Sequence, residues 1–148
     1  MKVKDIMTKE VIVVNKENTI KEVAHKLIEN KITCMPVVDE ANHVVGVISE
    51  KDLIYKEIDP SMPATVEYLG GIIFLGGTDE YQEELRKLTA TKVEQMMSKE
   101  VIAVSQDENI HEVARMLVDK GINSVPVIEQ DKLVGIVSST DIVKTLIQ

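Results

Sequence analysis

GVISEKD at residues 46–52 and GIVSSTD at residues 135–141 share one pattern in this chain of 148 residues. Each has glycine, two apolar residues, serine, two variable residues and aspartate, in that order. A serine that ends a strand and starts a helix can cap the helix, and an acidic residue three positions later lies in its first turn. The pattern therefore predicts a strand-to-helix junction, and it does so twice.

The repetition extends far beyond the two junctions. A shift of 90 positions aligns VKDIMTKEVIVV (3–14) with VEQMMSKEVIAV (93–104) and places Pro126 on Pro36. Deleting one residue from the following turn aligns the junctions as well. Repetition on this scale predicts two copies of one structural unit. We divide the chain into a first repeat (1–58), an inter-repeat insertion that serves as connector and helix (59–92) and a second repeat (93–148).

Each repeat has the same expected order of elements, β-α-β-β-α. Thr19 and Asn109 are the expected N-caps of the first helices, with Glu22 and Glu112 three residues on, which is a capping-box pattern. The second helices begin near the junction serines. The expected strands lie at residues 11–14, 35–38 and 44–48 in the first repeat and at 101–104, 125–128 and 133–137 in the second.

Apolar residues of the first helices recur at i, i+3, i+4, i+7 and i+8, which indicates one buried stripe on each helix. They are Ile20, Val23, Ala24, Leu27 and Ile28 in the first repeat and Ile110, Val113, Ala114, Leu117 and Val118 in the second. A small sheet with helices on one face cannot bury its apolar surface alone. We therefore expect an α/β (α+β) fold in which the two units pack sheet against sheet as a pseudo-two-fold pair, with two equivalent clefts between them.

Composition narrows the function and the location. The net charge of -8 and the lack of a basic stripe argue against binding to nucleic acid or to an anionic membrane surface. The apolar runs are too short for a membrane helix. Cys34 is the single cysteine, which excludes an intramolecular disulfide, and the charged N-terminus does not fit a signal peptide. We expect a compact, soluble, cytoplasmic protein.

The insertion belongs to neither repeat. Pro60 and Pro63 should end the preceding helix, paired glycines flank IIFL (72–75), and TDEYQEELRKL (78–88) has the pattern of a capped amphipathic helix. We expect an ordered connector or a dimer contact. A phosphate-binding loop is disfavoured because no Lys-Ser/Thr pair follows the glycines.

The repeated Ser and Asp have two interpretations. They can be capping residues and nothing more, since both stabilise a helix start. Alternatively, they lie at the carboxyl edge of a sheet, where α/β folds bind ligands. Helix N–H groups and a hydroxyl there favour a phosphate, and a carboxylate can accept hydrogen bonds from a ribose diol. The residues leave both interpretations open.

The chain as a whole resembles a tandem pair of cystathionine β-synthase (CBS) domains, also called a Bateman module. The lead-in DIMTKEVIVV, the helix NTIKEVAHKLIEN, the MPVV strand and the final junction carry the resemblance, and each occurs twice. The resemblance implies a non-catalytic regulatory module. Its ligands would be adenosyl compounds such as AMP, ADP, ATP or S-adenosylmethionine, and pairs would assemble into disc-shaped homodimers.

The resemblance also implies the site residues. The ribose-binding aspartates would be Asp52 and Asp141, the helix-start hydroxyls Ser49 and Ser138, and Thr140 a further polar contact. Each cleft would combine these groups from one repeat with the adenine wall of the other. The two adenine walls would be Thr8, Ile12, Ile32, Thr33 and Cys34, and Ser98, Ile102, Ile122, Asn123 and Ser124. Related nucleotide-binding sites often have basic residues just before the proline strand, and their absence here disfavours a triphosphate.

The two junctions differ in charge. Lys51 precedes Asp52, whereas Thr140 precedes Asp141. Either Lys51 contacts a ligand phosphate, so that only the cleft at Asp52 favours AMP or ADP, or it points to solvent and pairs with Glu50. The cleft at Asp141, lined by the neutral side chains of Ser138 and Thr140, is expected to discriminate less between a nucleotide and an adenosyl compound with an uncharged or cationic tail.

Two other classes of function are an enzyme and a ligand-free interaction module. Motifs of hydrolases, kinases and metalloenzymes are absent, and the three histidines are scattered, so an enzyme is disfavoured. Cys34 fits a buried thiol better than a redox sensor. A ligand-free interaction or dimerisation module remains the alternative, and the regulated target would be a separate protein or the module's own assembly. A homodimer is expected through the apolar stripes of the second helices: Leu53, Ile54 and Ile58, and Ile142, Val143, Leu146 and Ile147.

Overall fold

The computed structural model describes residues 1–58 and 92–148. The predicted connector therefore lies outside the described residues, apart from Lys92. The first repeat contains α1 (Val3–Ile6), β1 (Val14–Asn15), α2 (Ile20–Asn30), β2 (Cys34–Val38), β3 (Val44–Ser49) and α3 (Glu50–Ile58). The second contains α6 (Val93–Met96), α7 (Ile110–Lys120), β4 (Ser124–Glu129), β5 (Lys132–Ser138), α8 (Ser139–Lys144) and the 3-10 helix η1 (Thr145–Ile147).

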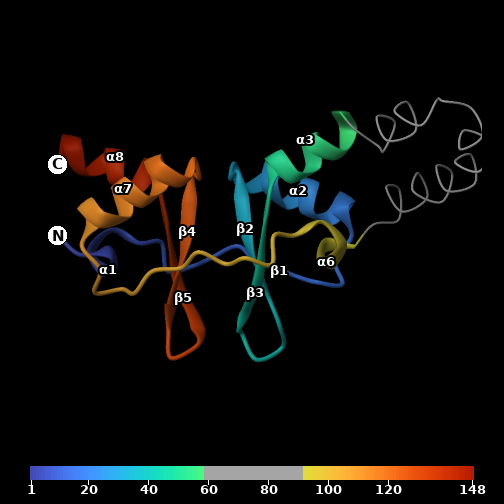
Figure 1. Cartoon of the computed structure of the whole chain (residues 1–148), viewed down its shortest axis with the longest axis horizontal. Coiled ribbons are helices and arrows are strands. Elements are labelled where there is room, and N and C mark those ends of the chain that lie inside the picture. The colour runs from blue at the N-terminus through green and yellow to red at the C-terminus, as the bar shows by residue number, and fades with distance from the viewer. Residues whose placement is uncertain (59–91) are drawn as a thin grey trace, which may run out of the picture.

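Each repeat is built around an antiparallel hairpin, β2–β3 in the first and β4–β5 in the second. Strand β1 adds to β2 in parallel, and Val104 makes the equivalent single bridge to Val127. Figure 1 shows the hairpins next to each other in the middle of the molecule, with α2 and α3 beside one and α7 and α8 beside the other. The mixed fold of two repeats is confirmed. The first strand is shorter than predicted, because residues 11–13 cross between the repeats instead of pairing.

The first helices begin where the sequence predicts. Glu22 N–H donates to Thr19 Oγ1 (3.2 Å), and Thr19 N–H donates to the Glu22 carboxylate (3.2 Å), so the capping box of α2 is confirmed. Asn109 caps α7, but its side chain accepts from His111 N–H (2.9 Å). The shorter reach to the second helical residue leaves Glu112 without the reciprocal role that Glu22 has in α2.

The apolar stripes are narrower than predicted. Val23 and Leu27 are buried in α2, as are their counterparts in α7. Ile28 and Val118, by contrast, are 78% and 80% exposed. A residue at i+8 is rotated by about 80° from residue i on an α-helix, which places both side chains at the edge of the stripe and away from the core.

The short lead-in helix of each repeat packs in the core of the other repeat. Val3 of α1 is fully buried against residues of the second repeat, among them Val113 and Val125. Val93 of α6 is fully buried against residues of the first, among them Val23 and Met35. Figure 1 accordingly shows α1 beside α7 and α8, and α6 beside α2. The repeats therefore exchange part of their cores and form one body.

The exchange of the lead-in helices explains why both junctions begin with a glycine, Gly46 and Gly135. After α1 the chain crosses β5, where Thr8 and Ile136 each donate an N–H to the other's carbonyl (2.9 Å). Ser98 and Val47 make the equivalent pair (2.9 and 3.0 Å). A Cβ atom at Gly46 would lie 2.6 Å from Met97 Sδ and 2.8 Å from the Ser98 carbonyl oxygen. Only glycine lets the crossing segment approach β3 this closely.

Candidate ligand-binding clefts between the repeats

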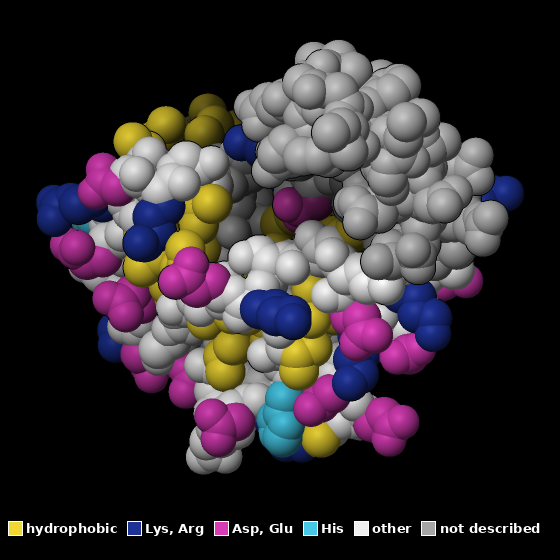
Figure 2. Space-filling model, turned by 45° about the vertical axis from the view of Figure 1, so that its right-hand side comes forward, with side chains coloured by type: hydrophobic (Ala, Val, Ile, Leu, Met, Phe, Trp, Pro, Cys, Tyr) yellow, Lys and Arg dark blue, Asp and Glu magenta, His cyan; other side chains and the backbone are white. Residues whose placement is uncertain are grey.

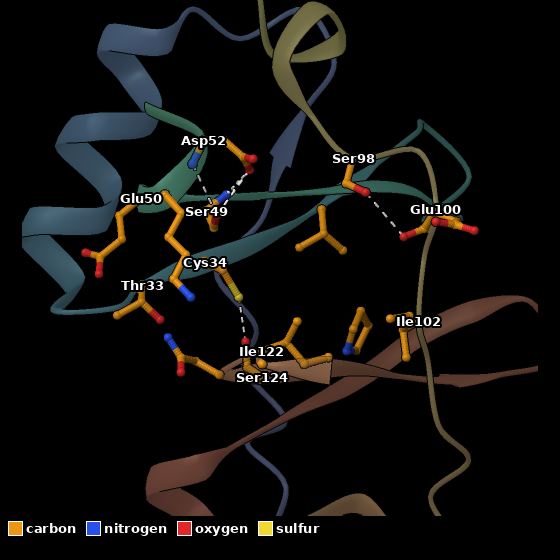
Figure 3. A pocket seen from close by; sticks show the side chains of 15 residues that line it. Thr33, Cys34, Ser49, Glu50, Asp52, Ser98, Glu100, Ile102, Ile122 and Ser124 are labelled. Carbon is orange, nitrogen blue, oxygen red and sulfur yellow. Dashed lines mark hydrogen bonds between the residues drawn. The ribbon is translucent and has the colours of Figure 1, made fainter. Parts of the chain in front are cut away.

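Two clefts lie between the repeats, and each takes its wall from one repeat and its junction from the other. The first, here called the Asp52 cleft, is lined by Ser49, Lys51 and Asp52. Figure 3 shows Ser49 and Asp52 at one side of it and Ile122 and Ser124 at the other. The predicted adenine-wall residues that line it are Ser98, Ile102, Ile122, Asn123 and Ser124.

The second, here called the Asp141 cleft, is lined by Ser138, Thr140 and Asp141. The wall residues that line it are Thr8, Ile12, Ile32, Thr33 and Cys34. The cavity volumes are about 200 Å³ and about 300 Å³, respectively, at or below the lower end of the range of small-molecule sites. The structure thus brings every predicted site residue to one of two clefts. A ligand role for these residues stays a prediction.

Both junctions have the same hydrogen bonds. Ser49 N–H and Ser49 Oγ donate to Asp52 Oδ2 (2.8 and 3.1 Å), and Asp52 N–H donates to Ser49 Oγ (3.4 Å). At the second junction, Ser138 N–H and Oγ donate to Asp141 Oδ2 (both 2.8 Å), and Asp141 N–H donates to Ser138 Oγ (3.2 Å). The capping interpretation is thus correct for one oxygen of each carboxylate.

The other oxygen of each carboxylate is differently placed. Neither Asp52 Oδ1 nor Asp141 Oδ1 takes part in a hydrogen bond with any residue of 1–58 or 92–148. Both side chains are half-buried at the cleft wall. A carboxylate oxygen has two lone pairs, so each aspartate can cap its helix and still accept hydrogen bonds from a ligand.

Cys34 and Ser124 meet where the clefts adjoin. Their side chains are hydrogen-bonded to each other in the Asp52 cleft (Figure 3), and both residues also line the Asp141 cleft. Burial raises the pKa of the Cys34 thiol, and the hydrogen bond with Ser124 opposes this shift only in part. The thiol is therefore protonated at neutral pH, which fits a buried structural cysteine and not a reactive one.

Several charged residues of the clefts were not predicted from the sequence. Glu10 and Glu100, at equivalent positions, line the Asp141 and Asp52 clefts, respectively. Lys31 and Lys144 line the Asp141 cleft. The expectation that only the Asp52 cleft has a lysine within reach of a ligand is therefore wrong. It considered only the residue before Asp141, whereas one lysine comes from the end of α2 and the other from the next turn of α8.

Lys31 has an unusual backbone conformation. It ends α2 with φ 54° and ψ 45°, in the left-handed region. Gly121 has the equivalent place after α7 (φ 61°, ψ 36°) and lines the Asp52 cleft. A side chain in this region costs about 1 kcal/mol relative to glycine. The alignment of Lys31 with Gly121 was the signal in the sequence that could have identified this residue.

Other kinds of site find little support in the described part of the chain. It contains no group of three or more His, Cys, Asp or Glu residues that could hold a metal ion. None of its helices is long and apolar enough to cross a bilayer. On the face shown in Figure 2, Lys and Arg side chains are interspersed with Asp and Glu and form no continuous basic stripe.

Comparison with known proteins identifies the family. The model of the CBS domain matches residues 3–59 and 93–148. The chain belongs to the CBS domain family. It is 30% identical to protein MJ1426 of Methanocaldococcus jannaschii, over 99% of this chain and 92% of that protein. It is 27% identical to the chloroplastic CBS domain-containing protein CBSX1 of Arabidopsis thaliana, over 97% of this chain and 63% of that protein.

Some relatives are considerably longer. The chain spans 60% of protein MK0525 of Methanopyrus kandleri and 45% of protein MJ0188 of Methanocaldococcus jannaschii. The CBS pair therefore also occurs within larger proteins.

Solved structures of CBS pairs match nearly the whole chain. CBSX2 in complex with AMP is 26% identical, with a TM-score of 0.77, over 99% of this chain and 96% of that one. The CBS domain pair of protein MJ0100, in complex with 5'-methylthioadenosine and S-adenosyl-L-methionine, is 27% identical, with a TM-score of 0.70, over 99% and 95%. Homologous CBS pairs therefore bind adenosyl small molecules.

Proposed function

We propose that this CBS pair is a non-catalytic regulatory module that binds adenosyl ligands in its two clefts. The observation that carries the proposal is the hydrogen bonding of the Asp52 and Asp141 carboxylates. Each uses one carboxylate oxygen to cap a helix, and its other oxygen, at the wall of a cleft, accepts no hydrogen bond from any residue of 1–58 or 92–148. Complexes of related CBS pairs with AMP, 5'-methylthioadenosine and S-adenosyl-L-methionine support the same ligand class.

The clefts suit the two halves of a nucleoside. The carboxylate oxygen can accept hydrogen bonds from the ribose diol. Ile102 and Ile122 provide apolar surface for the adenine ring in the Asp52 cleft, and Ile12 and Ile32 do so in the Asp141 cleft. Because each ligand would contact both repeats, binding would change the free energy of their relative arrangement. That change is the signal that we expect a target protein, or the module's own assembly, to sense.

Exposed apolar residues support assembly into a homodimer. Leu146 and Ile147 are 79% and 85% exposed, and Ile54 and Val143 are more than half exposed. Of the other predicted residues, Leu53 and Ile142 are half-buried and pack against the cores, and the side chain of Ile58 lies outside the described residues. The same exposed residues favour the second candidate, a module that only docks a partner and leaves its clefts empty. We also propose a cytoplasmic location.

Ligand binding to the purified protein separates the two candidates. AMP, ADP, ATP, S-adenosylmethionine, 5'-methylthioadenosine and NAD are tested by thermal shift and then by calorimetry, with GMP as the control for the base. A ligand at a hundred times its Kd stabilises the folded state by about 2.7 kcal/mol, enough to raise Tm by several degrees. A protein that responds to none of the adenosyl compounds is the docking module instead.

A further inference from the structure

The clefts differ in charge although their frameworks are equivalent. Both contain the junction aspartate and the equivalent glutamate, Glu100 in the Asp52 cleft and Glu10 in the Asp141 cleft. Two lysines, Lys31 and Lys144, balance these carboxylates in the Asp141 cleft. In the Asp52 cleft Glu50 is a third carboxylate, and a single lysine, Lys51, opposes the three. Counted over the described lining residues, the Asp141 cleft is neutral and the Asp52 cleft is strongly acidic.

The two lysines reach the Asp141 cleft from different repeats. Lys144 follows Thr140 by four residues and Asp141 by three in α8, so it lies on the same side of that helix. Lys31 comes from the end of α2, beside the wall residue Ile32. A ligand group between them would therefore be contacted by ammonium groups from both repeats.

Lys31 also stands where its equivalent is glycine. Its left-handed backbone conformation favours glycine, the residue found at the equivalent position 121. The lysine is therefore present against the local backbone preference. Strained residues of this kind gather at functional sites. Among the described residues, no ion pair involves Lys31 or Lys144, so no carboxylate in that part of the chain explains their placement.

We infer that the two clefts take different adenosyl ligands: a nucleoside monophosphate in the Asp141 cleft, and an adenosyl compound without a phosphate in the Asp52 cleft. This rests on the proposed function. A phosphate monoester carries a charge of about -1.5 to -2 at neutral pH, which two lysines can compensate. Three carboxylates disfavour that charge and suit a neutral thioether or a cationic sulfonium.

Proteins with one intact cleft test the inference. Asp52→Asn leaves the Asp141 cleft complete, and Asp141→Asn leaves the Asp52 cleft complete. The asparagine oxygen can still cap the helix, and melting temperatures check that both variants fold. Calorimetry with AMP and 5'-methylthioadenosine then measures each cleft. We expect the Asp52→Asn protein to prefer AMP at least tenfold, and the Asp141→Asn protein to bind 5'-methylthioadenosine at least as tightly as AMP.

Lysine variants in the Asp52→Asn background assign the preference to its source. Lys31→Gly and Lys144→Gln should each lower AMP affinity about tenfold and leave 5'-methylthioadenosine affinity unchanged. Lys31→Gly should also fold at least as well as its parent, because glycine is favoured there. Lys120→Gln, at the end of α7 and outside both clefts, removes the same charge and should change neither affinity.

The outcomes test this inference separately from the proposed function on which it rests. Equal affinity for AMP and 5'-methylthioadenosine in the Asp52→Asn protein, or no effect of the two lysine variants, overturns the inference and leaves the proposed function standing. Failure of the unsubstituted protein to bind any adenosyl compound overturns both.

Discussion

Cys34 and Ser124 occupy equivalent positions, 90 residues apart, and their side chains meet where the two clefts adjoin. The contact joins the first residues of β2 and β4 across the boundary between the repeats. Because both residues line both clefts, we expect a ligand bound in either cleft to contact the same pair.

The first prediction uses this contact. A Ser124→Cys substitution should form a disulfide with Cys34 under mild oxidation, because the two side chains already touch. A crosslink that closes a loop of this length should stabilise the protein by about 4 kcal/mol. The change is measured as a mobility shift on a non-reducing gel and a rise in Tm that reductant reverses. Asn123→Cys, one residue away, is the control and should stay reduced under the same conditions.

The second prediction separates capping from ligand binding at the junctions. Asp52→Ala removes the cap and the ligand acceptor, so it should lower stability by about 1 kcal/mol and adenosyl affinity ten- to a hundredfold. Asp52→Asn keeps an oxygen for the cap and should lower the affinity with little loss of stability. The same comparison applies to Asp141. Urea unfolding and calorimetry on each variant provide the two quantities, and full affinity in the alanine variants would restrict both aspartates to capping.

The third prediction concerns the crossing segments. Gly46→Ala should destabilise the protein by about 1 to 3 kcal/mol, because the new methyl group would meet the Ser98 carbonyl oxygen, which belongs to rigid backbone. Gly135→Ala should cost less, since the Thr8 carbonyl oxygen is 3.1 Å away. At Gly121 a Cβ meets nothing within 4 Å, so Gly121→Ala reports only the cost of the left-handed conformation, about 1 kcal/mol. Equal losses at Gly46 and Gly121 would contradict the close approach.

The fourth prediction concerns pH. The exchanged helices are joined to the opposite repeat by Lys4–Asp107 (2.7 Å) and Lys92–Glu17 (2.7 Å). A hydrogen bond from Lys4 and its charge lower the pKa of Asp107, and Lys92 lowers the pKa of Glu17 in the same way. A carboxylate whose folded pKa is lowered stabilises the protein above its ordinary pKa, and the contribution disappears as the pH falls through the folded value.

We therefore expect a small loss of stability as the pH falls below about 4, and the loss should be smaller in high salt because both pairs are exposed. Urea midpoints between about pH 6 and pH 3 measure the effect. The double variant Asp107→Asn, Glu17→Gln should be less stable at neutral pH and should show a flatter pH dependence. An unchanged pH profile in that variant would show that the pairs contribute nothing measurable.

Much of this structure could be predicted because the same pattern of helix starts and strands occurs twice in the sequence. Ser49 and Ser138, or Thr19 and Asn109, confirm each other as helix starts, and a pattern that repeats at one spacing is hard to produce by chance. The exchange of α1 and α6 could not be predicted in this way. Val3 and Val93 are both valines at equivalent positions, so either helix fits the core of either repeat. Local sequence patterns therefore do not show whether each helix packs in its own repeat or in the other one.

The charges of the clefts were missed for a different reason. Lys31 and Lys144 belong to no repeated motif, and their counterparts are Gly121 and Tyr55. The shared motifs of the two repeats do not include the positions at which the repeats differ. In a module with two pseudo-equivalent sites, those differences are what can make the sites select different ligands.

The exchanged helices also bear on how the chain folds. During synthesis the first repeat lacks Val93, Met96 and Met97 of its core until the start of the second has been made, so its folding depends on contacts between residues far apart in sequence. Cleavage within residues 59–91 would leave two fragments, each holding the helix that completes the other's core. Such fragments should be poorly structured alone and should fold upon mixing, as complementing halves do. Loss of α1 by truncation at the N-terminus would therefore first damage the C-terminal repeat.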